Sequence, residues 1–320
     1  MALELLKENN NYAEAFGEFI ETRSANEPAW LRLLRQKSFD RFEQTGFPTV
    51  KDEDWKYTNV APIARGDFAP VFDSESAADF NSFRYEEMRD STLVFVNGVF
   101  RKDLSSVGGL SNAGTVLTFD EALASGEQEA IIREYCSREG ENGFALLNSA
   151  FSQGVLIVLK ADKKVEAPIH LLFLTDASKA AAATFPRVLI VAEENSHATF
   201  VESYASAASD AYLTNSVIGL VLKDGAHVLH YKVQRESADA FHIAETTADL
   251  GANATYDTTT INFGAALSRH GIEVRMDREG ANCSVDGLYM VDGDQHTDTH
   301  SVIDHRQPRC ASHQLYKGIL

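Results

Sequence analysis

The residue types best suited to chemistry gather near the end of the 320-residue chain. His296, Asp298 and His300 alternate, and alternating residues of a β-strand lie on one face. Histidine, carboxylate and thiolate groups bind transition metals, so these three residues and Cys310 are candidate metal ligands. Further donors of the same kinds follow at Asp304, His305 and His313. The alternative, which we favour, is the hydrated face of a half-exposed strand.

The three cysteines, Cys136, Cys283 and Cys310, lie far apart in the sequence and form no CxxC pair. This pattern argues against a disulfide framework and indicates a reducing compartment, the cytoplasm. Cys283 and Cys310 are separated by about one repeat of the second half of the chain, so they could stack as neighbouring thiols. A shift of one residue would place them on opposite faces, where each would act as a small hydrophobic residue.

A second set of acidic residues could support a carbohydrate-active enzyme: Asp286, Asp292, Asp294 and Asp298. Sugar-binding faces usually carry aromatic platforms, but both tryptophans, Trp30 and Trp55, lie in the first third of the chain. The sequence Asp292-Gly293-Asp294 is more typical of a turn. No glycine-rich phosphate loop and no GxSxG motif occurs, so the sequence identifies no catalytic centre.

The most distinctive local sequence is KDEDWKYTNV, at positions 51–60. Trp55 and Tyr57 flank Lys56 behind three acidic residues. Aromatic residues of this kind are favoured in protein interfaces, so the segment could anchor a partner. It could equally attach the helical part of the chain to the β part.

The composition excludes several classes of function. The chain carries 47 acidic and 29 basic residues, a net charge of −18. This charge repels phosphate backbones and anionic lipids, so we expect neither nucleic acid nor membrane as a partner. No apolar run reaches the roughly 18 residues of a membrane helix, and the first residues lack the pattern of a secretory signal.

The first part of the chain, residues 1–149, is predicted to be a mainly helical domain. Tyr12, Phe16 and Phe19 have the spacing of one helix face. Asn26 is the predicted N-cap of a second helix that ends near Gly46. Two further elements are a β-hairpin near residues 91–100, around Asn-Gly, and a helix after a capping box in SGEQ at 125–128.

The second part, residues 150–320, has the period-two alternation of β-strands throughout. In HVLHYKVQ, at 227–234, polar and apolar residues alternate between two faces. The segments NSHATF, GAHVLH, GANATY and GANCSV align without gaps, which makes His197, His227, Asn253 and Asn282 equivalent. Each repeat holds two strands, too few for a propeller blade. We therefore predict a mostly β fold, a right-handed parallel β-helix preceded by the helical domain.

The last residues fit the same repeat. One further period after Asn282 reaches 311–313, where ASHQLYKG offers another strand start. This fifth repeat contains only one strand, so we expect the native chain to continue, and we interpret the β-helix as incomplete at its C-terminus.

At this point the sequence resembles a known family. EDWKYTNV is similar to a string of the SufD subunit in the SufB/SufD family of the SUF iron–sulfur cluster assembly system. The segments FVNGVF, FALLNSAF, PIHLLF, FPRVLI, YKVQRES, LSRH and DGLY then follow in the family's order. The ending resembles the family's Q-x-x-D…H-x-x-P-x-x-x-S-x-x-x-[FY]-K-G-I pattern. The matching residues are Trp55, Lys56, Tyr57, Gln295, Asp298, His305, Pro308, Ser312, Tyr316, Lys317 and Gly318.

This resemblance implies a non-catalytic scaffold subunit. Its partners would be a SufB-like paralogue and a SufC-like ABC ATPase, and ATP hydrolysis would belong to the latter. An iron–sulfur cluster would be present at the level of the assembled complex, with no cofactor assigned to residues of this chain. Two alternatives remain open from the residues alone: a β-helix enzyme acting on carbohydrate, and a passive structural solenoid.

Overall fold

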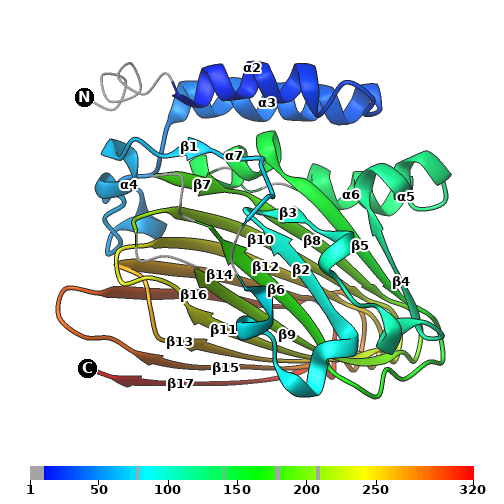
Figure 1. Ribbon diagram of the computed structural model, residues 1–320. Helices are drawn as coiled ribbons and strands as arrows, with labels where there is room; N and C mark the ends of the chain where they lie inside the picture. Colours follow the sequence, from blue (N-terminus) through cyan, green and yellow to red (C-terminus); the bar gives the residue numbers. More distant parts are fainter. Residues whose placement is uncertain (1–10, 77–78, 139, 141, 177–180, 207–209) are drawn as a thin grey trace.

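The chain folds as a two-sheet parallel β-solenoid of about six turns with helices over one end (Figure 1). The computed structural model describes residues 11–76, 79–138, 140, 142–176, 181–206 and 210–320. The first ten residues of the predicted helical domain lie outside the described residues. The chain descends coil by coil from the helices to the last strand, so the prediction of a parallel β-helix is confirmed.

Each coil contributes one strand to each of two facing sheets. Sheet A has the order β16-β14-β12-β10-β8-β5-β4, with β7 and β1 attached beside β10, and sheet B has the order β17-β15-β13-β11-β9-β6-β2-β3. The strands of sheet A are β1 (Ala69–Pro70), β4 (Gly114–Thr118), β5 (Gln153–Leu159), β7 (Ala182–Thr184), β8 (Pro186–Ala192), β10 (Leu213–Leu222), β12 (Phe241–Leu250), β14 (Leu267–Met276) and β16 (His296–His305). The strands of sheet B are β2 (Thr92–Val96), β3 (Val99–Phe100), β6 (Ile169–Thr175), β9 (His197–Ser206), β11 (His227–Arg235), β13 (Thr255–Asn262), β15 (Asn282–Met290) and β17 (Ala311–Ile319).

Neighbouring coils stack in a continuous parallel register. His227 on β11 lies opposite His197 on β9 and Thr255 on β13, and Thr255 lies opposite Asn282 on β15. The predicted equivalence of His197, His227 and Asn282 is confirmed, but the assignment of Asn253 is wrong by two residues. The predicted start of a fifth repeat is confirmed, because Ala311 lies opposite Asn282.

The turn between the coils explains that error. One residue per turn has a positive φ, and in the five turns after the first the next strand starts two residues later. The residues at this position are Asp162, Asn195, Gly225, Asn253, Gly280 and Arg309. Asparagine and glycine tolerate this left-handed conformation best. Matching the letters GAN therefore aligned the turn residue Asn253 with the strand residue Asn282.

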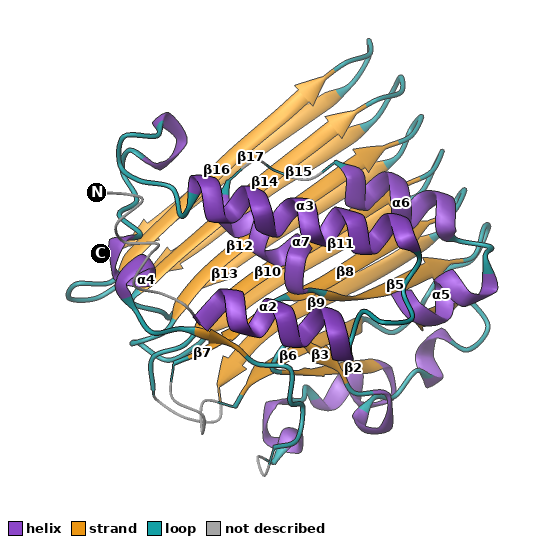
Figure 2. Ribbon diagram, turned by 90° about the horizontal axis from the view of Figure 1, so that it is seen from above, coloured by secondary structure: helices purple, strands orange, loops and turns teal. Residues whose placement is uncertain are grey.

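Helices cover the start of the solenoid and part of the outer face of sheet A (Figure 2). They are α2 (Asn11–Thr22), α3 (Ala29–Thr45), α4 (Ala61–Arg65), α5 (Phe119–Ser125), α6 (Glu129–Ser137) and α7 (Gly143–Phe151). Short 3-10 helices are η1 (Glu53–Trp55), η2 (Phe80–Phe83), η3 (Glu86–Ser91), η4 (Lys102–Leu104) and η5 (Gly108–Leu110). The predicted buried face of α2 is confirmed, since Tyr12, Phe16 and Phe19 are all buried.

Two predicted helix caps are wrong. Pro28, which was expected in the first turn of α3 behind an N-cap at Asn26, is itself the N-cap, and no side chain caps this helix. The capping box belongs to α5, where Thr118 and Glu121 bond reciprocally to backbone amides. The predicted box at 125–128 makes no side-chain cap for α6. The end of α3 at Gly46 and the hairpin β2–β3 around Asn97-Gly98 are confirmed.

The apolar core has two main parts. One fills the space between the sheets at the end of each coil where the turns are tight, with Val228, Tyr256 and Ile272 among its members. The other joins α2, α3 and α7 to the solenoid around Phe151, which contacts several aromatic rings. Burial of these rings holds the helices to the first coils. Strands β2 and β4 precede residue 150 and already belong to the sheets, while the boundary at 149/150 stays a prediction.

Candidate functional site

Strand β16 places His296, Asp298 and His300 on the outer face of sheet A. There they lie opposite Leu267, Arg269 and Gly271 of β14. Asp298 is not free, because Arg269 and Thr58 both donate to its carboxylate. In the part of the chain that the structure describes, no group of three or more His, Cys, Asp or Glu residues could hold a metal ion. The three candidate ligands thus share a face, and the central one already has a cation as its partner.

The other polar residues of the tail make separate local contacts. The Nε2 atom of His305 lies 2.9 Å from the hydroxyl of Ser312, and Asp304 accepts from Arg306 at 2.6 Å. His313 on β17 is exposed. The structure therefore does not bring the tail donors to a common point.

The cysteines do not form a stacked thiol pair. Cys283 faces the interior and lies opposite Ser312, two residues beyond Cys310. Burial raises the pKa of the Cys283 thiol to about 12, so this thiol stays protonated. Cys310 is half-buried, and its sulfur lies 3.4 Å from the carbonyl oxygen of Arg278. Cys136 is buried in α6.

The four aspartates that suggested a carbohydrate-active enzyme do not converge. Asp286 is on the outer face of β15, where it accepts from the backbone of Leu315 at 3.0 Å. Asp292 and Asp294 belong to the turn before β16, with Gly293 at a φ of 60°, as the sequence predicted. Asp298 is on the opposite sheet. Nothing in this arrangement supports the carbohydrate alternative.

The structure instead brings the distinctive string at 51–60 to β14 and β16. The guanidinium carbon of Arg269 lies 4.1 Å from the centre of the buried Trp55 ring. Arg269 also donates to the carbonyl oxygen of Asp54 at 2.7 Å and to Asp298, which accepts from Thr58 as well. We call Trp55, Thr58, Arg269 and Asp298 the clasp.

The clasp fixes the N-terminal region to the later coils. Trp55 also stacks on Phe144 of α7 with ring centres 5.4 Å apart. The interpretation that this string attaches the helical part to the β part is therefore correct for Trp55. Tyr57 has a different environment, because 81% of its surface is exposed. A contact between Tyr57 and a partner stays a prediction.

A group of titratable residues lies between the sheets. His230 Nε2 lies 2.7 Å from Glu202, and the Lys232 ammonium lies 2.9 Å from the same carboxylate. The ammonium group also lies 4.0 Å from the centre of the Tyr204 ring. All four residues are almost completely buried. We call Glu202, Tyr204, His230 and Lys232 the lumen cluster.

Further buried polar residues continue the lumen cluster toward the end of the coils opposite the positive-φ turns. Glu236 accepts from Thr214 at 2.7 Å and lies 2.7 Å from His242 Nδ1. His270 lies 2.9 Å from the hydroxyl of Thr246. The interior is therefore apolar at one end of the coils and polar at the other.

Burial and pairing shift the pKa values in opposite directions. Burial alone would raise the pKa of Glu202, but Lys232 and His230 hold it well below its usual range. Burial lowers the pKa of Lys232, and Glu202 opposes this change. Burial also lowers the pKa of His242 and, further, that of His270. The paired Glu202 is thus an ionised carboxylate inside the solenoid, compensated by its neighbours.

Sequence reasoning identified the alternation in HVLHYKVQ but not which face is internal. The strand directs Val228, His230, Lys232 and Gln234 inward, and Leu229, Tyr231 and Val233 outward. The sequence did contain an indication of the inward face, because Glu202 lies one coil before Lys232 and opposite it in the sheet. Opposite charges in adjacent parallel strands can compensate each other inside a solenoid.

The fold and these contacts define a class of protein: a parallel β-solenoid with an N-terminal helical cap clasped to its later coils. Its residues 6–171 match the family model "SufBD protein N-terminal region", and residues 173–320 match "SUF system FeS cluster assembly, SufBD core domain". The chain belongs to the SufBD family of the SUF iron–sulfur cluster assembly system.

Individual relatives agree with this assignment. The chain is 31% identical over 308 residues to an iron–sulfur cluster assembly SufBD family protein of Synechocystis sp., an alignment that covers 93% of this chain and 68% of the relative. It is 24% identical over 290 residues to the iron–sulfur cluster assembly protein SufD of Escherichia coli, with 89% and 65% covered. It is 24% identical over 323 residues to SufB of Bacillus subtilis, with 94% and 68% covered. The chain thus spans about two thirds of the length of these relatives.

None of the helices in the described residues has both the length and the apolar character needed to cross a membrane.

Proposed function

We propose that this protein is a SufD-like scaffold subunit of an iron–sulfur cluster assembly complex in the cytoplasm. Its partners would be a SufB-like paralogue and a SufC-like ABC ATPase, with ATP hydrolysis carried out by the latter. The observation that supports this proposal most strongly is the match of both SufBD family models, which together extend over residues 6–320 with a break of one residue. The cluster itself is the cargo of the assembled complex.

The continuous strand ladders of the solenoid support a scaffold role. A parallel solenoid presents long flat sheet faces, and each coil contacts its neighbours through continuous ladders. The clasp adds contacts between residues more than two hundred positions apart, which join the later coils to the cap. Within the described residues, no group of three or more His, Cys, Asp or Glu side chains is placed to hold a metal ion.

A genetic test addresses the proposal. The gene is deleted in the native organism under conditions where the SUF system is the only route to clusters, and the activity of a cluster-containing enzyme is measured. We expect that activity to fall and to return with the wild-type gene. Unchanged cluster enzymes in the deletion strain would contradict the proposal. Purified protein alone is expected to hydrolyse no ATP, and turnover without the ATPase would contradict the non-catalytic role.

A further inference from the structure

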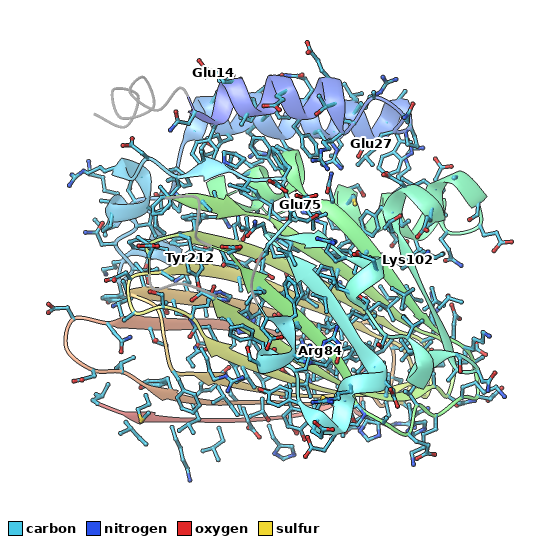
Figure 3. All side chains as sticks on the ribbon, viewed as in Figure 1. Glu14, Glu27, Glu75, Arg84, Lys102 and Tyr212 are labelled. Atoms are coloured by element: carbon cyan, nitrogen blue, oxygen red, sulfur yellow. The ribbon has the colours of Figure 1, made fainter. Side chains whose placement is uncertain are left out.

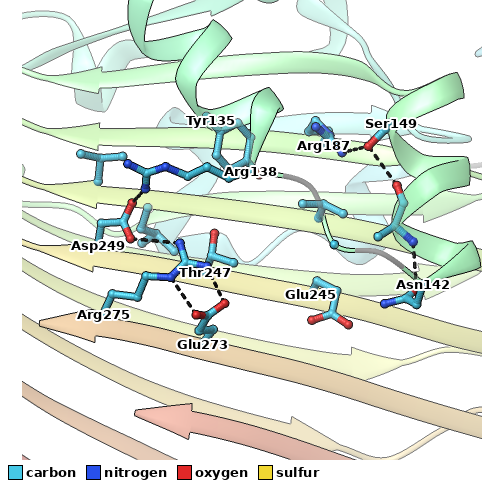
Figure 4. A pocket seen from close by; sticks show the side chains of 15 residues that line it. Tyr135, Arg138, Asn142, Ser149, Arg187, Glu245, Thr247, Asp249, Glu273 and Arg275 are labelled. Atoms are coloured by element: carbon cyan, nitrogen blue, oxygen red, sulfur yellow. Dashed lines mark hydrogen bonds and ion pairs between the residues drawn. The ribbon is translucent and has the colours of Figure 1, made fainter. Parts of the chain in front are cut away.

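A cavity of about 310 Å³ lies between α6, α7 and the outer face of sheet A (Figure 4). Glu245 of β12 lines this cavity and also a second one of about 170 Å³, which reaches to Trp55 and His300. The Glu245 carboxylate therefore stands between two spaces on the same face of the sheet. The smaller cavity borders the clasp residues Trp55 and Arg269, whereas the larger one contains no residue of the clasp or of the lumen cluster.

The strand next to Glu245 has a glycine at the opposite position. Gly271 of β14 lies between Glu245 on β12 and His300 on β16. A Cβ atom at Gly271 would overlap the Glu245 carboxylate, which lies across the glycine. Because Gly271 has no side chain, the outer face of the sheet has a notch at this position, and the Glu245 carboxylate occupies it.

The other charged groups around the larger cavity have partners. Arg275 donates to Glu273 at 2.6 Å and to Asp249 at 3.3 Å, and Arg138 also pairs with Asp249. Arg187 donates to the hydroxyl of Ser149 at 3.0 Å. Figure 4 shows these pairs as dashed lines, whereas no such line reaches Glu245.

Glu245 itself has no hydrogen-bond or ion-pair partner among the described residues. The nearest guanidinium on the side of the smaller cavity, Arg269, is engaged in the clasp with Asp298. A half-buried carboxylate without a partner loses hydration and gains nothing in return, so it favours a bound positive charge. The space beside it is much larger than a bare ion needs, and the described residues provide no metal-ligand cluster.

We propose that this cavity binds an organic cation, an ammonium or guanidinium group, through the Glu245 carboxylate. The Thr247 hydroxyl on the same face of β12 provides a further hydrogen-bond acceptor in the larger cavity. The group could belong to a free amine or to a lysine or arginine side chain of a protein partner. The chemistry is the same, and the experiment separates the two sources.

The pH dependence of binding follows from the surroundings of Glu245. Burial raises the pKa of this carboxyl to about 7; Arg269 opposes the shift, while Glu273 and Asp54 add to it. Ionisation therefore rises from roughly 10% at pH 6 to roughly 90% at pH 8, so affinity for a permanent cation rises about tenfold. His300 and Arg269 also line the smaller cavity.

The test uses agmatine, which carries one guanidinium and one ammonium group, in titration calorimetry with the purified protein at pH 6 and pH 8 and constant ionic strength. We expect saturable binding that is about tenfold tighter at pH 8 and is lost in Glu245→Gln. The matched control Glu194→Gln changes an exposed glutamate and should bind like the wild type. Thermal unfolding verifies that both variants are folded.

Two results would overturn the proposal: no saturable agmatine binding by the wild type at pH 8, or equal binding by Glu245→Gln. The source of the group is found by comparing co-purification of SUF partners with wild type and Glu245→Gln. Weaker co-purification of the variant identifies a partner side chain, and unchanged co-purification identifies a free amine. Agmatine binding is measured without partners, so its failure leaves the proposed scaffold function untouched.

Discussion

Arg269 lies over the ring of Trp55, with 4.1 Å between the guanidinium carbon and the ring centre, and it forms an ion pair with Asp298 on the next strand. These residues come from the cap, β14 and β16. All three belong to the strings by which the sequence resembles the SufB/SufD family: Trp55 to EDWKYTNV, Arg269 to LSRH and Asp298 to the ending. A shared motif in this chain thus corresponds to a physical contact between distant segments.

Removal of the clasp carboxylate should destabilise the protein. Asp298→Ala leaves the buried Arg269 guanidinium without its counter-charge, and we expect a loss of about 2–3 kcal/mol in the free energy of unfolding. Urea denaturation measures this loss. Asp294→Ala, in the exposed turn before β16, serves as the control and should change stability by less than about 0.5 kcal/mol. Equal effects of the two substitutions would contradict the role of the clasp.

The lumen cluster should behave as a coupled unit. Lys232→Met removes the cation beside the buried Glu202, with an expected loss of about 3 kcal/mol. Glu202→Gln should destabilise by a similar amount, because it leaves Lys232 uncompensated. The loss in the free energy of unfolding of the double variant should be roughly 1–3 kcal/mol smaller than the sum of the two single losses. A double-mutant cycle in urea measures this coupling, and strictly additive losses would show that the charges do not interact.

Stability should fall as the pH is lowered from 7 to 5. Burial lowers the pKa of His170 to about 4, with Arg235 and Arg84 adding to the shift, and it also lowers the pKa values of His242 and His270. The folded state therefore binds fewer protons at these histidines than the unfolded state does below about pH 6.5. Glu245 acts in the opposite direction, since its pKa is raised and the folded state binds its proton first.

The three histidines act in one direction and Glu245 in the other, so the free energy of unfolding should fall as the pH drops below about 6.5. Urea midpoints at pH 7, 6 and 5.5 measure it. His170→Gln removes one of the three groups and should reduce the slope by about 1.4 kcal/mol per pH unit. A stability that stays constant or rises between pH 7 and 5.5 would contradict the neutral state of these buried rings.

The turn glycines should tolerate substitution worse than a helix glycine. Gly225 has a φ of 70°, and a Cβ atom there would overlap the Asn195 side chain of the previous turn. Gly225→Ala should therefore lose about 1–2 kcal/mol. Gly17 is exposed on helix α2, and no atom lies near the position of its Cβ. Gly17→Ala should therefore raise the free energy of unfolding by up to about 1 kcal/mol. Thermal unfolding compares the two, and shifts of the same sign would contradict this account of the turns.

The β-solenoid could be predicted from the sequence because polar and apolar residues alternate along the strands and turn residues recur between them. It did not reveal which side of β11 faces inward, since the polar residues His230 and Lys232 are buried beside Glu202 of the neighbouring coil. Local periodicity gives no information on such a partner. The misassigned Asn253 has a similar cause, because backbone conformation, not residue type, defines the repeat position.

Local sequence patterns could not predict the contacts of the tail residues either. His296, Asp298 and His300 share a face as alternation predicts, but the partner of Asp298 comes from β14 and from a loop near the start of the chain. The notch at Gly271 and the carboxylate of Glu245 come together only through the stacking of β12, β14 and β16. Long-range register, which no single segment encodes, creates both.

The most direct test of the central proposal is co-purification. The tagged product of the complete gene is co-expressed with the SufB-type and SufC-type proteins of the same organism and analysed by affinity capture and gel filtration with light scattering. The proposed scaffold role predicts one peak that contains all three proteins. A peak in which the SufB-type and SufC-type proteins associate while this protein elutes alone would contradict it.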